Sequence, residues 1–504
     1  MTADGSDVPP GRIRYRFPAL ERRGVIAGWR GGQVGTVAAG LVLAVLTLRN
    51  RPSTSGVVMA VTVVGASVAV AFWPVAGRTG EQWLPVLVRW SWNGVAGRRF
   101  RPDPGPADGR RVVVAGRPGV AARDVPIRSA GAPRWPFDGL RILATGDGAG
   151  RDGMGMVVDE QARTVTAVLS VRGHSFALLG PGEQDARVAA WARALASLAR
   201  EGSAVHRLQW VETCLPDDGL AVRAHLAGHA VLAPGTDAVR SYRDLLDESA
   251  PVTRRHRILV VVSVHRGRSG RAVRSGGGGL AGAAAVLERE VTAVHRALTG
   301  ADLGVDGVLG RRSLVRVITE ALGPAPGATV VPAAPGPWPM GVGTQWDAVR
   351  TDAVWHAVYW VSEWPRVDVH PDFLGPLLFA PLRRTLSVVM EPVDPVRAAR
   401  QVAQARTAGL ADGELRRRNG FLSSARHTRE HASVEERDVE LADGHAQFRY
   451  SGYVGVTADS EQELGAACAE LEQAAGQSRL EVRRLYGQQD AALLCLLPLG
   501  RGLS

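Results

Sequence analysis

The chain has 504 residues, a net charge of +11 at pH 7 and 60 basic residues, all of them arginine. Because lysine is absent, the chain has neither the lysine of a Walker A loop nor a Schiff-base lysine, which excludes a P-loop ATPase. The three cysteines, at 214, 468 and 495, are too far apart for a zinc motif and fit a reducing cytosol. We expect no catalytic function, no metal and no cofactor.

Residues 1–30 form a basic N-terminus, and two uncharged apolar runs follow at 31–48 and 56–73. Each run has about 18 residues, enough at 1.5 Å per residue to cross a hydrocarbon layer of roughly 30 Å. The alternative is a signal peptide followed by a core helix. A second run of equal length, reached through Arg49 and Arg51 with no cleavage site, favours a transmembrane helical hairpin over 31–75.

Arginines gather before the first run and after the second. The positive-inside rule therefore predicts a multi-pass protein of the cell membrane with both termini in the cytoplasm. The net charge suits an anionic partner, either the inner leaflet or nucleic acid, and the leaflet is favoured because many of the arginines lie in the first 111 residues. The short loop between the runs would lie outside.

Residues 76–134 combine a surface segment with a linker. Three tryptophans lie between 83 and 92, but Pro85 and Arg89 interrupt this short stretch, which favours an interfacial helix over a third span. Residues 101–136 are rich in Pro, Gly and Arg and predict a linker with one strand at 111–115.

Residues 135–322 predict a first α+β domain. Strands are expected at 164–171, 206–211 and 257–264, and helices at 183–200, 219–233, 241–248, 280–298 and 313–322. Strand, amphipathic helix and strand follow one another, as in a split β-α-β unit.

A Pro, Ala and Gly linker at 323–340 precedes a second α+β domain at 341–504. Strands are expected at 353–361, 385–390, 448–456 and 480–485, and helices at 395–409, 424–441 and 460–476. The apolar run 491–496 is expected to close the sheet as a strand. The fold class is thus α+β, with a membrane hairpin and two ferredoxin-like domains.

A loop of Arg, Gly and Ser is predicted between 266 and 279. Its arginines could contact phosphate or an acidic partner, which makes Arg266, Arg268, Arg271 and Arg274 the candidate anion-contacting residues. Gly277, Gly279 and Gly282 match G-x-G-x-x-G, yet they begin about a dozen residues after the strand, too far for a dinucleotide site. We interpret the segment as a mobile basic loop, for which DNA, lipid and protein stay open as partners.

His225 and His229 are spaced i, i+4 on a predicted helix. The sequence H-L-A-G-H lacks the glutamate of a zinc protease, and no third ligand is evident, so two surface histidines are the favoured interpretation.

The segment 14–24, R-Y-R-F-P-A-L-E-R-R-G, stands directly before two spans and resembles the PrgI-type two-span subunit of Gram-positive conjugative type IV secretion. The segments 166–171, 176–179, 207–212, 453–456 and 488–500 resemble the N-terminal, non-ATPase half of the conjugation ATPase that partners it. Together they are similar to actinobacterial integral membrane proteins of conjugation or secretion clusters. In such ATPases a P-loop domain follows a segment like the last one.

This resemblance implies a structural subunit of a type IV-like secretion or conjugation machine. Its expected partners are a separate cytoplasmic conjugation-type ATPase, other membrane subunits of the machine and further copies of itself. A core membrane component of a type VII secretion complex is the first alternative. A membrane-bound transferase that uses the arginine loop is the second, but it would need clustered acids for a divalent metal.

Overall fold

The computed structural model describes residues 31–75, 78–95, 100–102, 136–145, 153–173, 176–217, 219–229, 235–249, 253–323, 338–339, 341–352, 354–418 and 425–502. The basic N-terminus with its 14–24 motif, the predicted strand at 111–115 and most of the 323–340 linker lie outside these residues.

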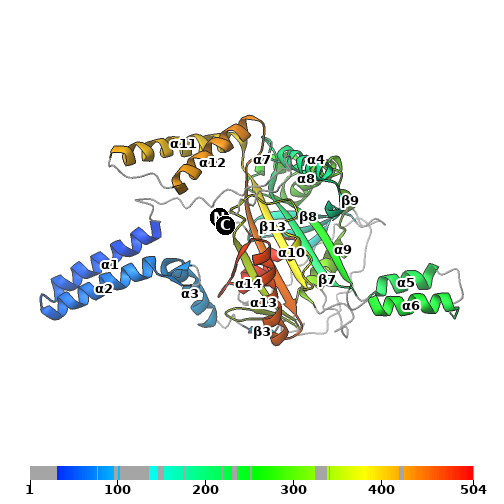
Figure 1. Ribbon diagram of the computed structural model, residues 1–504, viewed down its shortest axis with the longest axis horizontal. Helices are drawn as coiled ribbons and strands as arrows, with labels where there is room; N and C mark the ends of the chain where they lie inside the picture. Colours follow the sequence, from blue (N-terminus) through cyan, green and yellow to red (C-terminus); the bar gives the residue numbers. More distant parts are fainter. Residues whose placement is uncertain are drawn as a thin grey trace, which may run out of the picture.

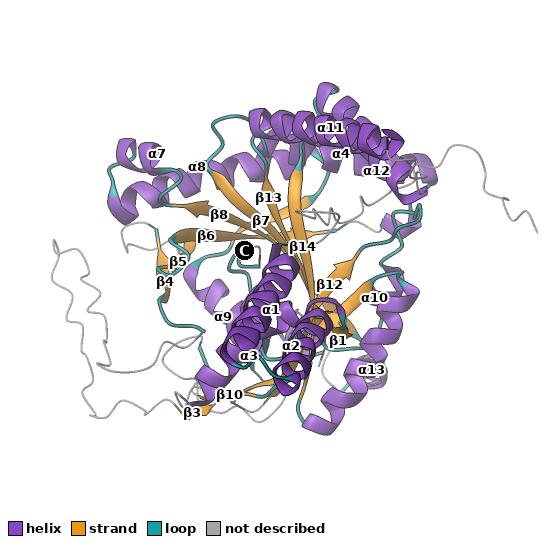
Figure 2. Ribbon diagram, turned by 90° about the vertical axis from the view of Figure 1, so that its left-hand side faces the viewer, coloured by secondary structure: helices purple, strands orange, loops and turns teal. Residues whose placement is uncertain are grey.

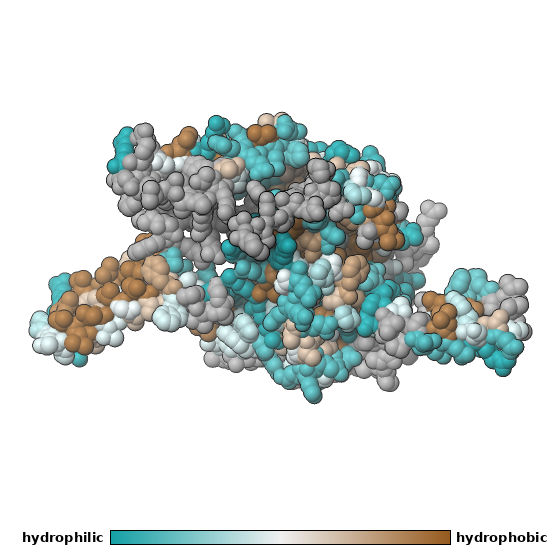
Figure 3. Space-filling view, viewed as in Figure 1, coloured by the Kyte–Doolittle hydropathy of each residue, from teal (hydrophilic) through white to brown (hydrophobic). Residues whose placement is uncertain are grey.

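Two apolar helices, α1 (Gly31–Asn50) and α2 (Thr54–Phe72), pack against each other as a hairpin that projects from the rest of the chain (Figure 1). Ser53 caps α2, its Oγ accepting from the amide of Gly56. Of the described helices, these two are long and apolar enough to cross a membrane, and only 11% and 17% of their windows are buried. A core helix would be mostly buried, whereas the apolar side chains of these two helices lie on the surface (Figure 3). The predicted hairpin is confirmed as two candidate membrane-spanning helices.

A short β-hairpin, β1 (Pro74–Val75) and β2 (Arg78–Thr79), leads into α3 (Gly80–Val95). The predicted interfacial segment is therefore helical, with Pro85 inside the helix.

The next part of the chain alternates strands and helices. Its strands are β3 (Phe100–Pro102), β4 (Leu140–Ala144), β5 (Gly155–Asp159), β6 (Thr164–Arg172), β7 (Val205–Pro216), β8 (Arg254–His265) and β9 (Gly304–Val308). Its helices are a 3-10 turn (Phe176–Leu178), α4 (Pro181–Leu198), α5 (Leu220–His229), α6 (Asp237–Ser249), α7 (Gly270–Ser275), α8 (Gly279–Gly300) and α9 (Arg311–Leu322).

The last part has a similar order. Its strands are β10 (Gly341–Thr344), β11 (Val349–Thr351), β12 (Val354–Glu363), β13 (Arg384–Pro392), β14 (Phe448–Ala458) and β15 (Glu481–Arg484). Its helices are α10 (Gly375–Leu378), α11 (Pro395–Arg418), α12 (Ala425–Ala442), α13 (Glu461–Gln477) and α14 (Gln489–Leu496).

Thirteen of the described strands form one antiparallel sheet, in the order β3-β10-β11-β12-β14-β13-β7-β8-β6-β5-β4, with β15 beside β12 and β9 beside β6. The two predicted α+β regions meet where β7 pairs with β13. The coarse prediction, an α+β chain with an N-terminal hairpin, is confirmed. The predicted domain boundary stays a prediction. The sheet itself runs across both predicted regions.

From the centre of the sheet outward, the strands are connected in the same order in both directions. In the first half the order is β7-β8-β6-β5, and in the second half it is β13-β14-β12-β11. Thr166 faces Ser263 in the first half, and His356 faces Thr457 in the second. Both pairs are hydrogen-bonded through their side chains, at 3.2 and 2.9 Å. We infer that the sheet is an internal repeat with an approximate two-fold axis.

Matching equivalent residues of the two halves locates this axis at Val211 and Ser387, which lie opposite each other where β7 pairs with β13. Arg207 lies beside Ser263, and the amide of Thr457 donates to the carbonyl of Arg383. Each arginine precedes the axial pair by four residues (211 − 207 and 387 − 383). A residue of β7 therefore corresponds to the residue of β13 that is 176 positions later.

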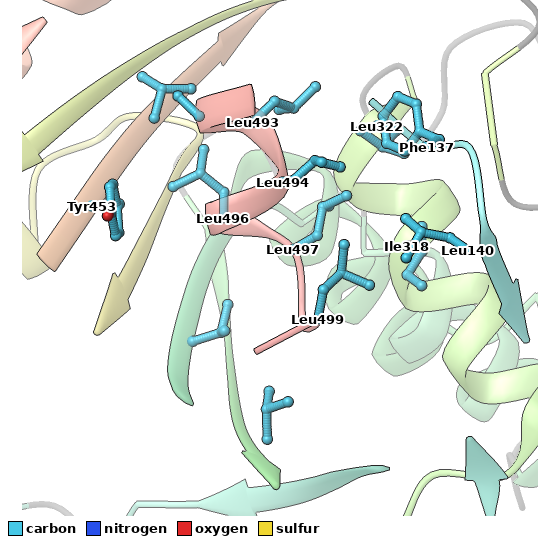
Figure 4. Close-up of a cluster of buried hydrophobic side chains, with 14 of the residues drawn as sticks. Phe137, Leu140, Ile318, Leu322, Tyr453, Leu493, Leu494, Leu496, Leu497 and Leu499 are labelled. Atoms are coloured by element: carbon cyan, nitrogen blue, oxygen red, sulfur yellow. The ribbon is translucent and has the colours of Figure 1, made fainter. Parts of the chain in front are cut away.

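Helices cover both faces of the sheet (Figure 2). On one face α4 and α8 pack on the first half, and α10 and α13 pack on the second. On the other face α9 and α14 share a core with the strands, in which leucines from α14 approach Ile318 and Leu322 of α9 (Figure 4). Along β8, Leu259 and Val261 face this second layer while Val260 and Val262 face the first, as the two-residue period of a strand requires.

Two local predictions are wrong. The run 491–496 is not a strand, because α14 occupies it and buries Ala492, Leu493 and Leu494 beneath the sheet. A short apolar run cannot distinguish a buried strand from a buried helix by its period alone. The predicted loop 266–279 contains α7, whose buried Val273 packs near α8.

Candidate functional site

The predicted anion-contacting arginines divide into two pairs. Arg266 forms an ion pair with Glu160, and Arg268 donates to Glu391 at 2.9 Å. Arg271 and Arg274 lie on α7 and are exposed. Two of the four side chains thus hold the segment to the turn after β5 and to the end of β13, and the other two remain available to an anionic partner.

Glu391, at the end of β13, collects several positive side chains. Arg449 approaches its carboxylate at 3.1 Å and Arg207 at 3.8 Å, in addition to Arg268. Burial opposes ionisation of this carboxyl, but the hydrogen bond from Arg268 and the nearby positive charges outweigh it, so the pKa of Glu391 is lowered. The same balance, with Arg266 and Arg141, lowers the pKa of Glu160.

His206 lies beside this group. Its Nδ1 is 3.2 Å from Arg268, and its ring meets the ring of His265 edge-on at 5.3 Å. Burial, with the charges of Arg207 and Arg268, lowers the pKa of His206 to about 4. The imidazole is therefore neutral at physiological pH.

A buried ion pair lies between the two halves of the sheet. Arg384 of β13 is 1% exposed, and its guanidinium pairs with Glu212 of β7, which is 3% exposed. His256 of β8 completes the group, its Nδ1 2.7 Å from Glu212 Oε1. Sequence reasoning missed this group, since its members are 172 and 44 residues apart.

The segment 497–502 crosses the face of the sheet that α9 and α14 cover. Gln209, fully buried on β7, holds it: its Nε2 lies 2.9 Å from the carbonyl of Leu497, and its Oε1 accepts from the amide of Gly500 at 2.8 Å. Arg501 pairs with Asp159 at 2.6 Å. These contacts fix the segment to β7 and β5, and no motif in the sequence marks them.

The glycines of the G-x-G-x-x-G match have structural roles. Gly277 and Gly279 have φ of 104° and 56°, values that favour glycine, and they form the turn between α7 and α8. A Cβ at Gly282 would overlap the carbonyl oxygen of Val273, so this glycine allows α7 and α8 to pack closely.

His225 and His229 stack on exposed α5 with ring centroids 4.3 Å apart. Among the described residues, no group of three His, Cys, Asp or Glu side chains could hold a metal ion. One apolar cavity, lined by Trp191, Leu208 and Val294 among others, measures about 10 Å³. That volume is at the lower limit for a single water molecule.

The hairpin α5–α6 is a candidate interaction surface. It leaves the sheet between β7 and β8, and the ion pair of Arg223 with Asp247, at 2.5 Å, joins its two helices. Val222, Tyr242 and Leu245 are exposed on it. Apolar and aromatic side chains of this kind serve as anchors in protein interfaces.

Its counterpart in the repeat is the hairpin α11–α12, between β13 and β14. Because β7 and β13 are antiparallel, the two hairpins leave the sheet at opposite ends (Figure 1). The sheet therefore holds two helical projections apart.

No protein-family model matches the chain, and no similar curated protein was found.

Proposed function

We propose that the chain is a membrane-anchored structural subunit of a type IV-like secretion or conjugation machine, and that it docks a separate cytoplasmic ATPase. The two candidate spans supply the anchor. The arginines that flank them favour a cytoplasmic position for both ends of the hairpin and for the sheet.

The end-to-end arrangement of the molecule carries this proposal. The membrane hairpin α1–α2 projects from one end, and α5–α6 projects from the other, with the sheet between them (Figure 1). A docking element farthest from the bilayer is accessible to a large cytoplasmic partner. The sheet, joined across its centre by β7 and β13, would fix the distance between anchor and partner.

The proposed contact is the exposed apolar surface of α5–α6. Tyr242 and Leu245 are one helical turn apart on α6, so one partner groove can receive both. The other exposed candidates, Arg271 and Arg274, would face an anionic partner and are not needed for ATPase docking.

Photo-crosslinking in the native host tests the site. A photoreactive amino acid at Tyr242 is expected to crosslink to a lysine-containing P-loop ATPase of the conjugation type. The same amino acid at exposed Val367 is the control and is expected to give no such product. A crosslink from Val367 but not from Tyr242 would contradict the assigned surface. A crosslink from Tyr242 to an FtsK-like ATPase with several P-loops would favour the type VII alternative.

Introducing a negative charge supplies an independent test. Leu245→Glu should abolish recovery of the ATPase with the tagged protein, because burying an unpaired carboxylate opposes docking. Val367→Glu should leave recovery unchanged. Equal recovery with both variants would contradict docking at α6.

A further inference from the structure

Helix α3 is apolar on two faces, and the described residues cover only one of them. Trp83, Val86 and Trp90 form the covered stripe, in which Trp346 stacks on Trp83 at 5.8 Å and meets Trp90 edge-on at 5.4 Å. Arg89 reaches Asp490 of α14 at 3.5 Å. These contacts fix α3 to the second half of the sheet.

The opposite stripe is exposed. Leu84 is 63% exposed, Val88 is 60% and Trp92 is 68%, and these three residues recur at intervals of four along the helix. Leu87 is exposed beside them. Large apolar side chains that gather on one exposed stripe mark a surface that contacts a membrane or another protein.

The start of α3 lies against the ends of both candidate spans. Gly80 approaches the carbonyl oxygen of Val70 near the end of α2 so closely that a Cβ would overlap it. The carboxylate of Glu81 lies beside Gly32, in the first turn of α1. The side chain of Gln33 donates to the carbonyl of Ala71 at 3.1 Å and joins these two ends. Helix α3 therefore begins at the level where the hairpin would leave the bilayer.

We infer that α3 lies in the headgroup layer of the cytoplasmic leaflet, with Leu84, Leu87, Val88 and Trp92 in contact with lipid. The start of α3 contacts the hairpin, and a tryptophan at the end of the exposed stripe suits the membrane interface. Since the other face of α3 is fixed to the sheet through Trp346, the helix is a rigid joint that sets the orientation of the sheet on the membrane. This inference rests on the proposed membrane anchorage and adds a second lipid contact to it.

Spin labelling of the full chain in phosphatidylcholine and phosphatidylglycerol nanodiscs tests the lipid contact. A nitroxide at Val88→Cys should be relaxed more strongly by oxygen, which concentrates in lipid, than by a water-soluble nickel complex. A nitroxide at Leu245→Cys, on distant α6, should show the opposite order. Cys214 and Cys468 are buried, and labelling of the parent chain measures the background from Cys495.

Each other outcome overturns the inference. Preferential relaxation by nickel at Val88 would place the stripe in water, and shielding from both reagents would place it against protein. A label at Val61→Cys, on α2, separates the two claims. A lipid-type result at Val61 with a water-type result at Val88 contradicts only the role of α3. Water-type results at both positions contradict the anchorage as well.

Distance measurement between nitroxides at Val88→Cys and Phe379→Cys tests the rigid joint. The distribution should be narrow in the parent chain and broader when Trp346→Ala is added, because the alanine removes the ring that holds Trp83 and Trp90. Equal widths with and without Trp346 would contradict a joint built on this residue.

Discussion

The buried pair of Glu212 and Arg384 gives the sharpest test of the internal repeat. The approximate two-fold axis relates Glu212 to Val388 (212 + 176) and Arg384 to Leu208 (384 − 176). One side of the axis thus carries an ion pair, and the equivalent side carries two apolar residues. At the equivalent positions, the chain therefore already has two apolar side chains in place of an ion pair.

Removing one partner should be costly. In Arg384→Leu the carboxylate of Glu212 stays buried, with His256 as its remaining side-chain partner among those described above. Breaking a buried pair in this way costs about 3–5 kcal/mol. Glu212→Val should cost a similar amount, because it leaves the guanidinium of Arg384 buried without its carboxylate.

The double variant Glu212→Val with Arg384→Leu should recover most of the loss. It reproduces the residues found on the other side of the axis, and apolar replacement of a buried pair is often neutral or stabilising. The side chain of His256 is 38% exposed, so water can replace Glu212 as its partner. Thermal unfolding in detergent of the parent, both single variants and the double variant completes a double-mutant cycle. Losses that simply add in the double variant would refute the reasoning.

Three further outcomes follow from the site. His206 has a pKa lowered to about 4, so between about pH 6.5 and pH 4 the unfolded chain binds a proton that the folded chain does not, and stability falls as the pH falls through this window. His206→Gln should therefore lose less stability than the parent between pH 7 and pH 5. Gln209→Leu leaves the buried amide of Gly500 unsatisfied, at about 1–3 kcal/mol, and removes one donor from the Leu497 carbonyl, which keeps the amide of Leu499; it should speed hydrogen exchange in 497–502. Gly282→Ala should separate α7 from α8 and expose this junction to protease, because its Cβ meets the carbonyl of Val273.

Each of these predictions has a contradicting result. Identical pH profiles for His206→Gln and the parent would show that this imidazole does not titrate as described. Unchanged exchange at 497–502 would mean that other contacts hold the segment. Gly300→Ala, at a position with no atom near an added Cβ, is the control for Gly282→Ala and should leave the protease pattern unchanged. Matching patterns for the two variants would contradict the close packing of α7 and α8.

Local patterns predicted the elements well, because each depends on neighbouring residues. The charge-free runs at 31–48 and 56–73 predicted α1 and α2, and the β-branched run at 164–171 predicted β6. The fold was less accessible, because the pairing of β7 with β13 joins strands about 170 residues apart and no local signal specifies it.

The candidate sites were predictable only in part. The loop arginines were visible as a cluster, but the carboxylates that hold Arg266 and Arg268 come from a distant turn and a distant strand. The sequence showed three tryptophans in α3, whereas the partner of two of them, Trp346, lies more than 250 residues later. Side chains that meet through tertiary structure leave no periodic trace in the sequence.

Detergent co-purification from the native host, followed by quantitative mass spectrometry, tests the central claim most directly. We predict that tagged protein, extracted from membranes, recovers a lysine-containing P-loop ATPase of the conjugation type in a fixed ratio. Protein that is released without detergent, or that is recovered alone and binds a nucleotide sugar or a metal ion, would contradict a membrane-anchored scaffold.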